Sequence, residues 1–305
     1  MKNRPLQTGI VGVGRFGSRH ADKWLSFDNV RLCGFYDIDP EVQVRIPETK
    51  NIPLLPLDTL IETSDLIDIV VPASSHYAVA KTALEAGKHV FIEKPFTETP
   101  EQALELCELA RKNGSIVGIG HIERFNPVFL ALEKNLPGAP DRLEACRQGP
   151  FIPGIGVDVS IILELMVHDI DIVRRLIPSN IINITADGEI LYSNKIDRAR
   201  AVLHFENGSS AVLFASRAEN ERRREITCSL NGNDYTADLM NRRLLLPGKT
   251  RPLDFGFYDA MADELHRFSK AVQKNQRHCI NENDGLSSVK IASMIEKIIL
   301  EDQLS

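Results

Sequence analysis

Hydrophobic positions in the first part of the chain fall into short apolar runs that alternate with amphipathic stretches. The apolar runs predict strands at residues 8–13, 30–36, 66–71, 90–93 and 116–120. Helical spacing predicts helices at 16–25, 77–86 and 100–113, with Thr99 as an N-cap and with Gly87 and Gly114 just beyond two helix ends. Short apolar strands joined by helices indicate a parallel sheet with helices on both faces.

The pattern changes after His121. One long helix is predicted at residues 160–176, ending before Pro178. Strand-like segments follow at 182–191, 199–205, 210–215, 224–230, 234–238 and 243–246, and two final helices are predicted at 257–273 and 285–300. Asn207-Gly208 and Asn231-Gly232 separate neighbouring segments, as hairpin turns do. These features predict a second domain of α+β type with an open, mostly antiparallel sheet.

The glycines Gly12, Gly14 and Gly17 lie between the first strand and the first helix. In a dinucleotide-binding loop the first glycine permits the tight turn, the second lets the backbone approach a pyrophosphate, and the third lets the helix pack closely. Asp37 ends the second strand, where a carboxylate accepts hydrogen bonds from ribose hydroxyls and repels a 2′-phosphate. The loop therefore predicts NAD in preference to NADP, although a glycine turn in an unrelated α/β domain has the same letters. The remaining loop residues, Arg15 and Phe16, are candidate cofactor contacts.

These signals together predict an α/β fold with two domains. Residues 1–121 are expected to form a Rossmann domain with a doubly wound parallel sheet, and residues 122–305 the α+β domain. The last helix, at about 285–303, is a candidate to pack back on the first domain.

Composition narrows the class of protein. The 305 residues are 43% hydrophobic and 26% charged, with a net charge of −6, and a nucleic-acid binder usually has a basic excess. The five cysteines are scattered, which fits free thiols in a reducing cytosol better than disulfides or zinc. No apolar run approaches the ~18 residues of a membrane span, and the N-terminus lacks a signal-peptide pattern. We expect a cytoplasmic protein with neither nucleic acid nor membrane as partner.

Lys94 directly follows the strand at residues 90–93. Because the carboxyl ends of parallel strands face the ligand crevice, its ammonium is placed to stabilise an alkoxide during hydride loss. Glu93 lies beside it, and Ser74 and His76 follow the strand at 66–71, so all three are candidate cofactor contacts. A solvated loop lysine gives the same local pattern.

His168 lies in the helix predicted at residues 160–176, four residues after Glu164 on the same face. A histidine titrates near neutrality and can accept the proton of an alcohol, while a carboxylate beside it can orient the ring. Considered alone, this pattern favours a polar helix face toward solvent. Asp169 and Asp171 are potential metal ligands, but no nearby Cys or His completes a zinc set, so no metal is predicted.

Polar residues also follow the strand at 116–120, where the chain leaves the first domain. Among them His121, Arg124 and Asn126 are candidates to hold a polar or anionic substrate. An interdomain salt bridge or a turn would use the same residues.

The chain resembles the glucose-fructose oxidoreductase / inositol dehydrogenase / MocA family. The matching segments are residues 12–17, 71–77, 86–90 with Glu93-Lys94-Pro95, the helix that carries His168, and the late segments 264–268 and 284–286. The resemblance implies that Lys94 is the catalytic lysine, that His168 is the acid/base, and that the Lys94–Pro95 bond is cis. It also implies an open sheet in the second domain whose outer face pairs copies into a homodimer or homotetramer.

A narrower resemblance lies in residues 120–127 and 165–171. Both segments are similar to a branch of the family that oxidises the C3 hydroxyl of UDP-N-acetylglucosamine and supplies a 3-keto sugar nucleotide to an aminotransferase for lipid A. This implies a sugar or sugar-nucleotide substrate, and another polyol such as inositol is the alternative.

The family usually has an aspartate four residues before the histidine, where this chain has Glu164. A misplacement on the scale of about 1 Å can greatly reduce catalysis. The departure keeps open a rival interpretation, an NAD-binding sensor without turnover, although such a sensor has no need of Lys94 and His168.

Overall fold

The computed structural model describes residues 4–39, 42, 52–154 and 156–303. The chain forms two compact units, the first from residues 1–121 with 261–286 and the second from 122–260 with 287–305. Residues 261–286, assigned from the sequence to the second domain, thus cluster with the first unit. No helix among the described residues is long and apolar enough to cross a membrane.

The first unit is built on a parallel sheet of five strands in the order β2-β1-β3-β4-β5. The strands are β1 (Leu6–Val11), β2 (Val30–Tyr36), β3 (Leu66–Ile69), β4 (His89–Glu93) and β5 (Val117–Gly120). Strand order reverses beside β1, which leaves the crevice of a doubly wound sheet at the carboxyl ends of these strands. The predicted Rossmann fold is confirmed.

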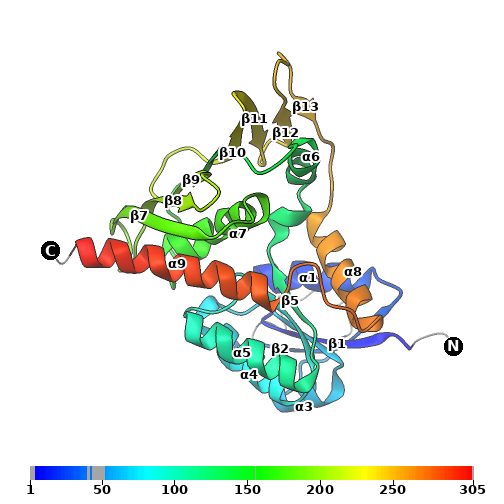
Figure 1. Ribbon diagram of the computed structural model, residues 1–305. Helices are drawn as coiled ribbons and strands as arrows, with labels where there is room; N and C mark the ends of the chain where they lie inside the picture. The colour runs from blue at the N-terminus through cyan, green and yellow to red at the C-terminus, as the bar shows by residue number, and fades with distance from the viewer. Residues whose placement is uncertain (1–3, 40–41, 43–51, 155, 304–305) are drawn as a thin grey trace. The chain divides into compact units, whose positions relative to one another are not determined.

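Helices cover both faces of this sheet (Figure 1). They are α1 (Arg15–Leu25), α3 (Leu57–Thr63), α4 (Ala73–Glu85), α5 (Pro100–Asn113) and α8 (Ala260–Gln273). One face packs Trp24 of α1 and Phe268 of α8 against Ile10 and Phe91 in a single buried cluster. Gly9 and Gly34 of the neighbouring strands leave room for α3, since a Cβ on either would clash with side chains there.

Helix α5 has both of its predicted caps. The Thr99 hydroxyl accepts from the Gln102 amide in a capping box, and Gly114 follows in the left-handed region at φ 65°. These local signals explain why the sequence predicted both ends of this helix correctly.

The second unit is built on a sheet of eight strands in the order β13-β12-β11-β10-β6-β9-β8-β7. The strands are β6 (Arg142–Gln148), β7 (Ile181–Glu189), β8 (Arg198–Phe205), β9 (Ser210–Ser216), β10 (Arg223–Leu230), β11 (Asn233–Asp238), β12 (Arg243–Leu245) and β13 (Leu253–Asp254). Neighbouring strands are antiparallel except β6 and β9, which are parallel. Gly208 at φ 86° turns β8 into β9, and Asn231 and Gly232 at φ 52° and 74° turn β10 into β11, so both predicted hairpins are confirmed.

The second unit also contains helices, one of which carries His168. They are η2 (Ile122–Phe125), α6 (Pro127–Asn135), the π-helix η3 (Ile162–Met166), α7 (Val167–Leu176) and α9 (Glu282–Asp302). The single helix predicted at 160–176 is therefore a π-helical turn followed by an α-helix. From Ser287 onward α9 clusters with the second unit, where Ile299 packs on Gly188 of β7, although the sequence suggested packing on the first domain.

Candidate active site

The glycine loop joins β1 to α1, and each glycine has its own steric reason. Gly12 has φ 89°, and a Cβ there would lie 2.6 Å from the Val70 carbonyl oxygen. A Cβ on Gly17 would lie 1.9 Å from the Gly12 carbonyl oxygen, so only glycine lets α1 begin this close to the loop. Gly14 has nothing within 4 Å of its Cβ position. That open space at the N-terminus of α1 is the cradle that a diphosphate needs.

Asp37 links the end of β2 to the glycine loop. Its Oδ2 accepts a hydrogen bond from the Val13 amide at 2.8 Å, and its Oδ1 accepts from the Asp39 amide at 2.9 Å. Each carboxylate oxygen has a second lone pair. The half-buried carboxylate can therefore accept the ribose hydroxyls of NAD while it fixes the loop, and the residues present fit the dinucleotide.

Two alanine substitutions separate packing from cofactor binding in this loop. Gly14→Ala should leave the Tm of the apo protein unchanged but weaken NAD binding at least about 10-fold, because the methyl group occupies the cradle. Gly17→Ala should lower the Tm itself, because the new Cβ collides with the Gly12 carbonyl. Thermal unfolding and NAD titration measure both effects, and Gly138→Ala, with open space around it, is the control. Unchanged NAD affinity in Gly14→Ala would contradict the assignment of the cradle.

The other predicted cofactor residues take different positions. Arg15, Phe16 and Ser74 are exposed at the starts of α1 and α4. His76 is only 1% exposed, and its ring lies between two carbonyl oxygens, with Nδ1 2.6 Å from Pro95 and Nε2 2.9 Å from Val71. Burial lowers the pKa of His76 in spite of these carbonyls. His76 thus ties together the chain segments that follow β3 and β4.

Lys94 follows β4 in a half-buried position, and the Lys94–Pro95 peptide is cis, as the family resemblance implied. Glu93 precedes it, with its carboxylate packed against Gly120 of β5, where a Cβ would lie 2.7 Å from Oε1. The next residue after β5, His121, is buried in the first unit.

In the second unit, His168 lies in the first turn of α7 and is 9% exposed. Glu164 precedes it in the π-helical turn η3, a kind of turn often found at functional sites. The Glu164 carboxyl carbon lies 3.0 Å from the Cβ position of Gly156, whose φ of 63° also favours glycine, so the carboxylate packs closely against that turn. Arg217 holds the segment before η3 by donating to the carbonyl oxygens of Gly156 and Val159.

The two predicted substrate residues of the second unit have partners within that unit. Arg124 donates two hydrogen bonds of 2.7 Å to the Asp171 carboxylate on α7. The Asn126 side chain caps α6 by accepting from the Val128 amide at 3.0 Å. Both residues therefore help to fix η2, α6 and α7 relative to one another.

A buried ion cluster also holds α7, and its central residue was missed by the sequence analysis. Arg147 of β6, 2% exposed, donates to Glu123 at 2.8 Å and to both Asp169 oxygens at 3.2 and 3.1 Å. Burial alone raises the pKa of Glu123, but the charge and hydrogen bond of Arg147, with smaller contributions from Arg224 and Asn126, together outweigh it and hold that pKa below its usual range. Since Asp169 directly follows His168, this cluster fixes the backbone next to the histidine.

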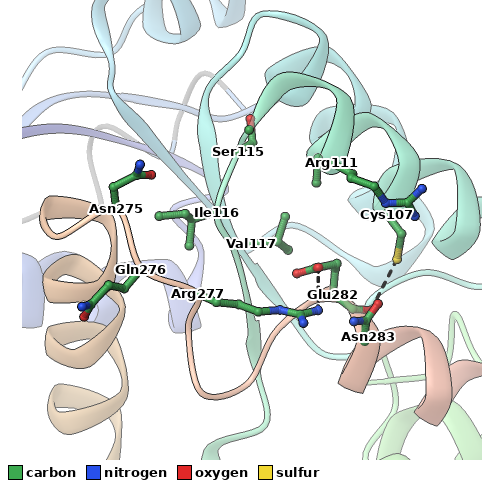
Figure 2. A pocket seen from close by; sticks show the side chains of 12 residues that line it. Cys107, Arg111, Ser115, Ile116, Val117, Asn275, Gln276, Arg277, Glu282 and Asn283 are labelled. Atoms are coloured by element: carbon green, nitrogen blue, oxygen red, sulfur yellow. Dashed lines mark hydrogen bonds and ion pairs between the residues drawn. The ribbon is translucent and has the colours of Figure 1, made fainter.

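The structure also has a pocket of about 450 Å³ in the first unit, away from these residues. Figure 2 shows it between α5, the start of β5 and the chain that connects α8 to α9. Arg277 pairs with Glu282 at 2.8 Å there, and Cys107 lies 3.5 Å from the Glu282 carbonyl oxygen. None of the predicted site residues lines this pocket.

The glycine loop, the Asp37 carboxylate and Lys94 after β4 define a dinucleotide-dependent oxidoreductase of the Rossmann class. A family model described as "Oxidoreductase family, NAD-binding Rossmann fold" matches residues 6–121, and the GFO/IDH/MocA C-terminal domain matches 157–237. The chain belongs to the glucose-fructose oxidoreductase / inositol dehydrogenase / MocA family. It is a dehydrogenase acting on CH–OH groups with NAD as cofactor.

Two dehydrogenases of this family are similar to the chain over most of its length. UDP-N-acetylglucosamine 3-dehydrogenase from Acidithiobacillus ferrooxidans is 32% identical over 280 residues, which cover 88% of each chain. A solved structure of that enzyme superposes with a TM-score of 0.90 at 30% identity, covering 97% of this chain and 98% of the other. Myo-inositol 2-dehydrogenase from Thermotoga maritima is 25% identical over 324 residues, 97% of each chain.

Proposed function

We propose that this dehydrogenase oxidises the C3 hydroxyl of UDP-N-acetylglucosamine. The observation that carries the proposal is the likeness to the Acidithiobacillus ferrooxidans enzyme, which spans nearly all of both chains in sequence and in fold. The inositol dehydrogenase also matches over nearly its full length, at lower identity, so a free polyol is the second candidate substrate.

The chain's own residues supply the proton chemistry in this proposal. His168 accepts the proton of the substrate hydroxyl, and the Lys94 ammonium stabilises the alkoxide that develops. Glu164 orients one of these groups. NAD, when bound, supplies the hydride acceptor. Gly12, Gly14, Gly17 and Asp37 hold the cofactor.

His121, Arg124 and Asn126 remain candidates for substrate contact. The guanidinium of Arg124 is engaged by Asp171, and the side-chain oxygen of Asn126 by the α6 cap. The amide nitrogen of Asn126 also donates to the Glu123 carboxylate and to the Leu239 carbonyl oxygen, so both side chains act first by fixing the elements around His168.

The proposal extends to partners of two kinds. A second copy of the chain pairs on the outward face of the eight-stranded sheet, giving a homodimer or homotetramer. The half-buried apolar residues Val202, Val212 and Phe214 lie on that face, opposite the buried positions of β8 and β9. The second partner is an aminotransferase, which uses the 3-keto product as its substrate.

A substrate panel tests the proposed function. NADH absorbance at 340 nm is followed with NAD and, in turn, UDP-N-acetylglucosamine, UDP-glucose, free N-acetylglucosamine and myo-inositol. The proposal expects UDP-N-acetylglucosamine to have the highest kcat/KM. Faster oxidation of myo-inositol would assign the polyol instead, and tight NAD binding without turnover of any compound would support the sensor interpretation.

The role of the Glu164 carboxylate in the reaction can be tested by removing its charge. Glu164→Gln keeps the shape of the side chain and removes its charge, so we expect kcat to fall at least about 10-fold if the carboxylate assists proton transfer. Glu144→Gln, at an exposed position of β6, is the matched control and should keep the kcat of the unaltered enzyme. Full activity in Glu164→Gln would show that this carboxylate has no part in the reaction.

A further inference from the structure

A buried histidine in the first unit lies between two carboxylates. His20 of α1 is 1% exposed, with Nδ1 2.9 Å from Asp68 Oδ2 and Nε2 3.3 Å from Glu93 Oε1. Asp68 comes from the middle of β3 and is fully buried, whereas Glu93 ends β4. The imidazole therefore links α1 to the strand end that carries Lys94.

His20 is charged at neutral pH. Burial alone lowers the pKa of His20, but the charges and hydrogen bonds of Asp68 and Glu93 outweigh it and raise that pKa to about 10. A protonated imidazole carries an N–H group on each ring nitrogen, so the His20 cation pairs with both the Asp68 and the Glu93 carboxylates. The same cation holds the pKa of Glu93 below its usual range in spite of burial.

The carboxylate of Glu93, which pairs with His20, also contacts the backbone of Lys94. The second oxygen of the Glu93 carboxylate accepts from the Lys94 amide at 3.2 Å. Gly120 on β5 bounds the same carboxylate, because any Cβ there would overlap it. On the other side of Lys94, the Pro95 carbonyl oxygen lies 2.6 Å from His76. The backbone that carries the Lys94 side chain is thus held at both of its neighbours.

We propose that His20 is a positioning residue for Lys94, acting through the Glu93 carboxylate, and this inference rests on the proposed function of Lys94. Asp68 has a second partner, since the Trp24 Nε1 donates to its Oδ2 at 2.6 Å. Removing His20 takes the shared cation from both carboxylates, and the Glu93 carboxylate then lacks it while it stays pressed between Gly120 and the Lys94 amide. Displacement of Lys94 by a fraction of an ångström lowers the rate of the chemical step.

A double-mutant cycle tests the route through Glu93. His20→Gln, Glu93→Gln and the double variant are compared for kcat and KM, with the substrate of the panel that gives the fastest NADH formation. We expect each single variant to lower kcat at least about 10-fold with KM changed less than about 3-fold, and the double variant to be no slower than the slower single. Losses that multiply in the double variant, or full kcat in His20→Gln, would overturn the proposal.

His278→Gln is the matched control. His278 is also a buried histidine of the first unit, 3% exposed, and its Nδ1 lies 2.7 Å from the Ile280 carbonyl oxygen. Its loss should lower the Tm without lowering kcat, which separates general destabilisation from positioning. An equal fall of kcat in His278→Gln and His20→Gln would contradict a specific role for His20.

Tryptophan fluorescence gives a readout that needs neither substrate nor NAD. The chain has a single tryptophan, Trp24, which shares the Asp68 oxygen with His20. Because a protonated imidazole quenches indole fluorescence more than a neutral one, emission excited at 295 nm should rise with a midpoint near pH 10. The rise should be absent in His20→Gln. Since the titration uses the unaltered protein, it holds even if the variant fails to fold, and a midpoint near 6.5 would overturn the proposal.

The turnover of Lys94→Ala, compared with that of His20→Gln, separates the role of Lys94 from the positioning role of His20. Full turnover by Lys94→Ala would overturn the proposed role of Lys94 and the positioning role with it. An inactive Lys94→Ala beside a fully active His20→Gln would overturn the positioning role alone.

Discussion

Replacing Lys94 by alanine is expected to lower kcat by about 10²–10³-fold while NAD binding changes little. The ammonium acts on charge that develops during the reaction, so its loss raises the barrier without weakening the ground-state complex. Lys94→Arg should not restore the rate, because a planar guanidinium cannot take the place of a compact ammonium. Steady-state NADH formation and a separate NAD titration measure the two quantities.

Lys81→Ala is the control for this substitution. Lys81 is another lysine of the first unit, on α4, where it pairs with Glu105 at 2.6 Å. It lies outside the predicted site, and its loss should leave kcat unchanged. Comparable kcat in Lys94→Ala and the unaltered enzyme would remove Lys94 from the mechanism.

Replacing Arg147 by methionine is expected to destabilise the protein by about 3–5 kcal/mol. The substitution leaves Glu123 and Asp169 buried without their common cation. Because methionine fills most of the volume of the arginine side chain, the loss comes mainly from these uncompensated charges. Urea unfolding should show a lower midpoint with an unchanged slope. Adding Glu123→Gln and Asp169→Asn should recover most of the loss, because the uncompensated charges are then gone.

Arg175→Ala is the matched control for the ion cluster. Arg175 pairs with Glu133 at 2.5 Å, but its side chain is 52% exposed. An exposed pair contributes at most about 1 kcal/mol, so the midpoint should move little. Equal losses for Arg147→Met and Arg175→Ala would show that the buried cluster is no more important than a surface pair.

The sequence predicted the first unit well because its signals are local. Each strand is a short apolar run, each glycine of the loop has a nearby steric cause, and Thr99 and Gly114 mark both ends of α5. Such features depend on neighbours in the chain, which one sequence displays directly.

Strand β6 was missed because a charge occupies one of its buried positions. Leu143, Ala145 and Arg147 face inward, and the arginine breaks the apolar alternation that signals a strand. Its partners Glu123 and Asp169 lie far away in the chain, on either side. Only the fold reveals that this charge is neutralised, so nothing in the local pattern places Arg147 in a core.

His20 and Asp68 were also missed, although one signal was present. An aspartate inside the apolar segment Leu66-Ile67-Asp68-Ile69 is a buried carboxylate if the segment is a strand, and a buried carboxylate needs a partner. His20 and Trp24 are four residues apart on α1 and therefore share a face. The pairing across β3 and β4 could not be read from the sequence, because it depends on how α1 packs.

The π-helical turn η3 likewise escaped prediction. Residues 160–176 have helical spacing throughout, and the extra residue of a π turn changes no residue type. The turn matters because it alters the direction of Glu164 relative to His168 from the one expected for an α-helix. The longer glutamate and the π turn occur together, and Glu164→Gln tests whether the pair remains functional.

Transfer of hydrogen from substrate to cofactor tests the central claim most directly. UDP-N-acetylglucosamine carrying deuterium at C3 is incubated with the enzyme and NAD, and the reduced cofactor is analysed by mass spectrometry. The account predicts NADH that is one mass unit heavier, formed more slowly than from unlabelled substrate if hydride transfer limits the rate, and formed about 10²–10³-fold more slowly still with Lys94→Ala. Reduced cofactor without deuterium, or no reduced cofactor at all, would contradict it.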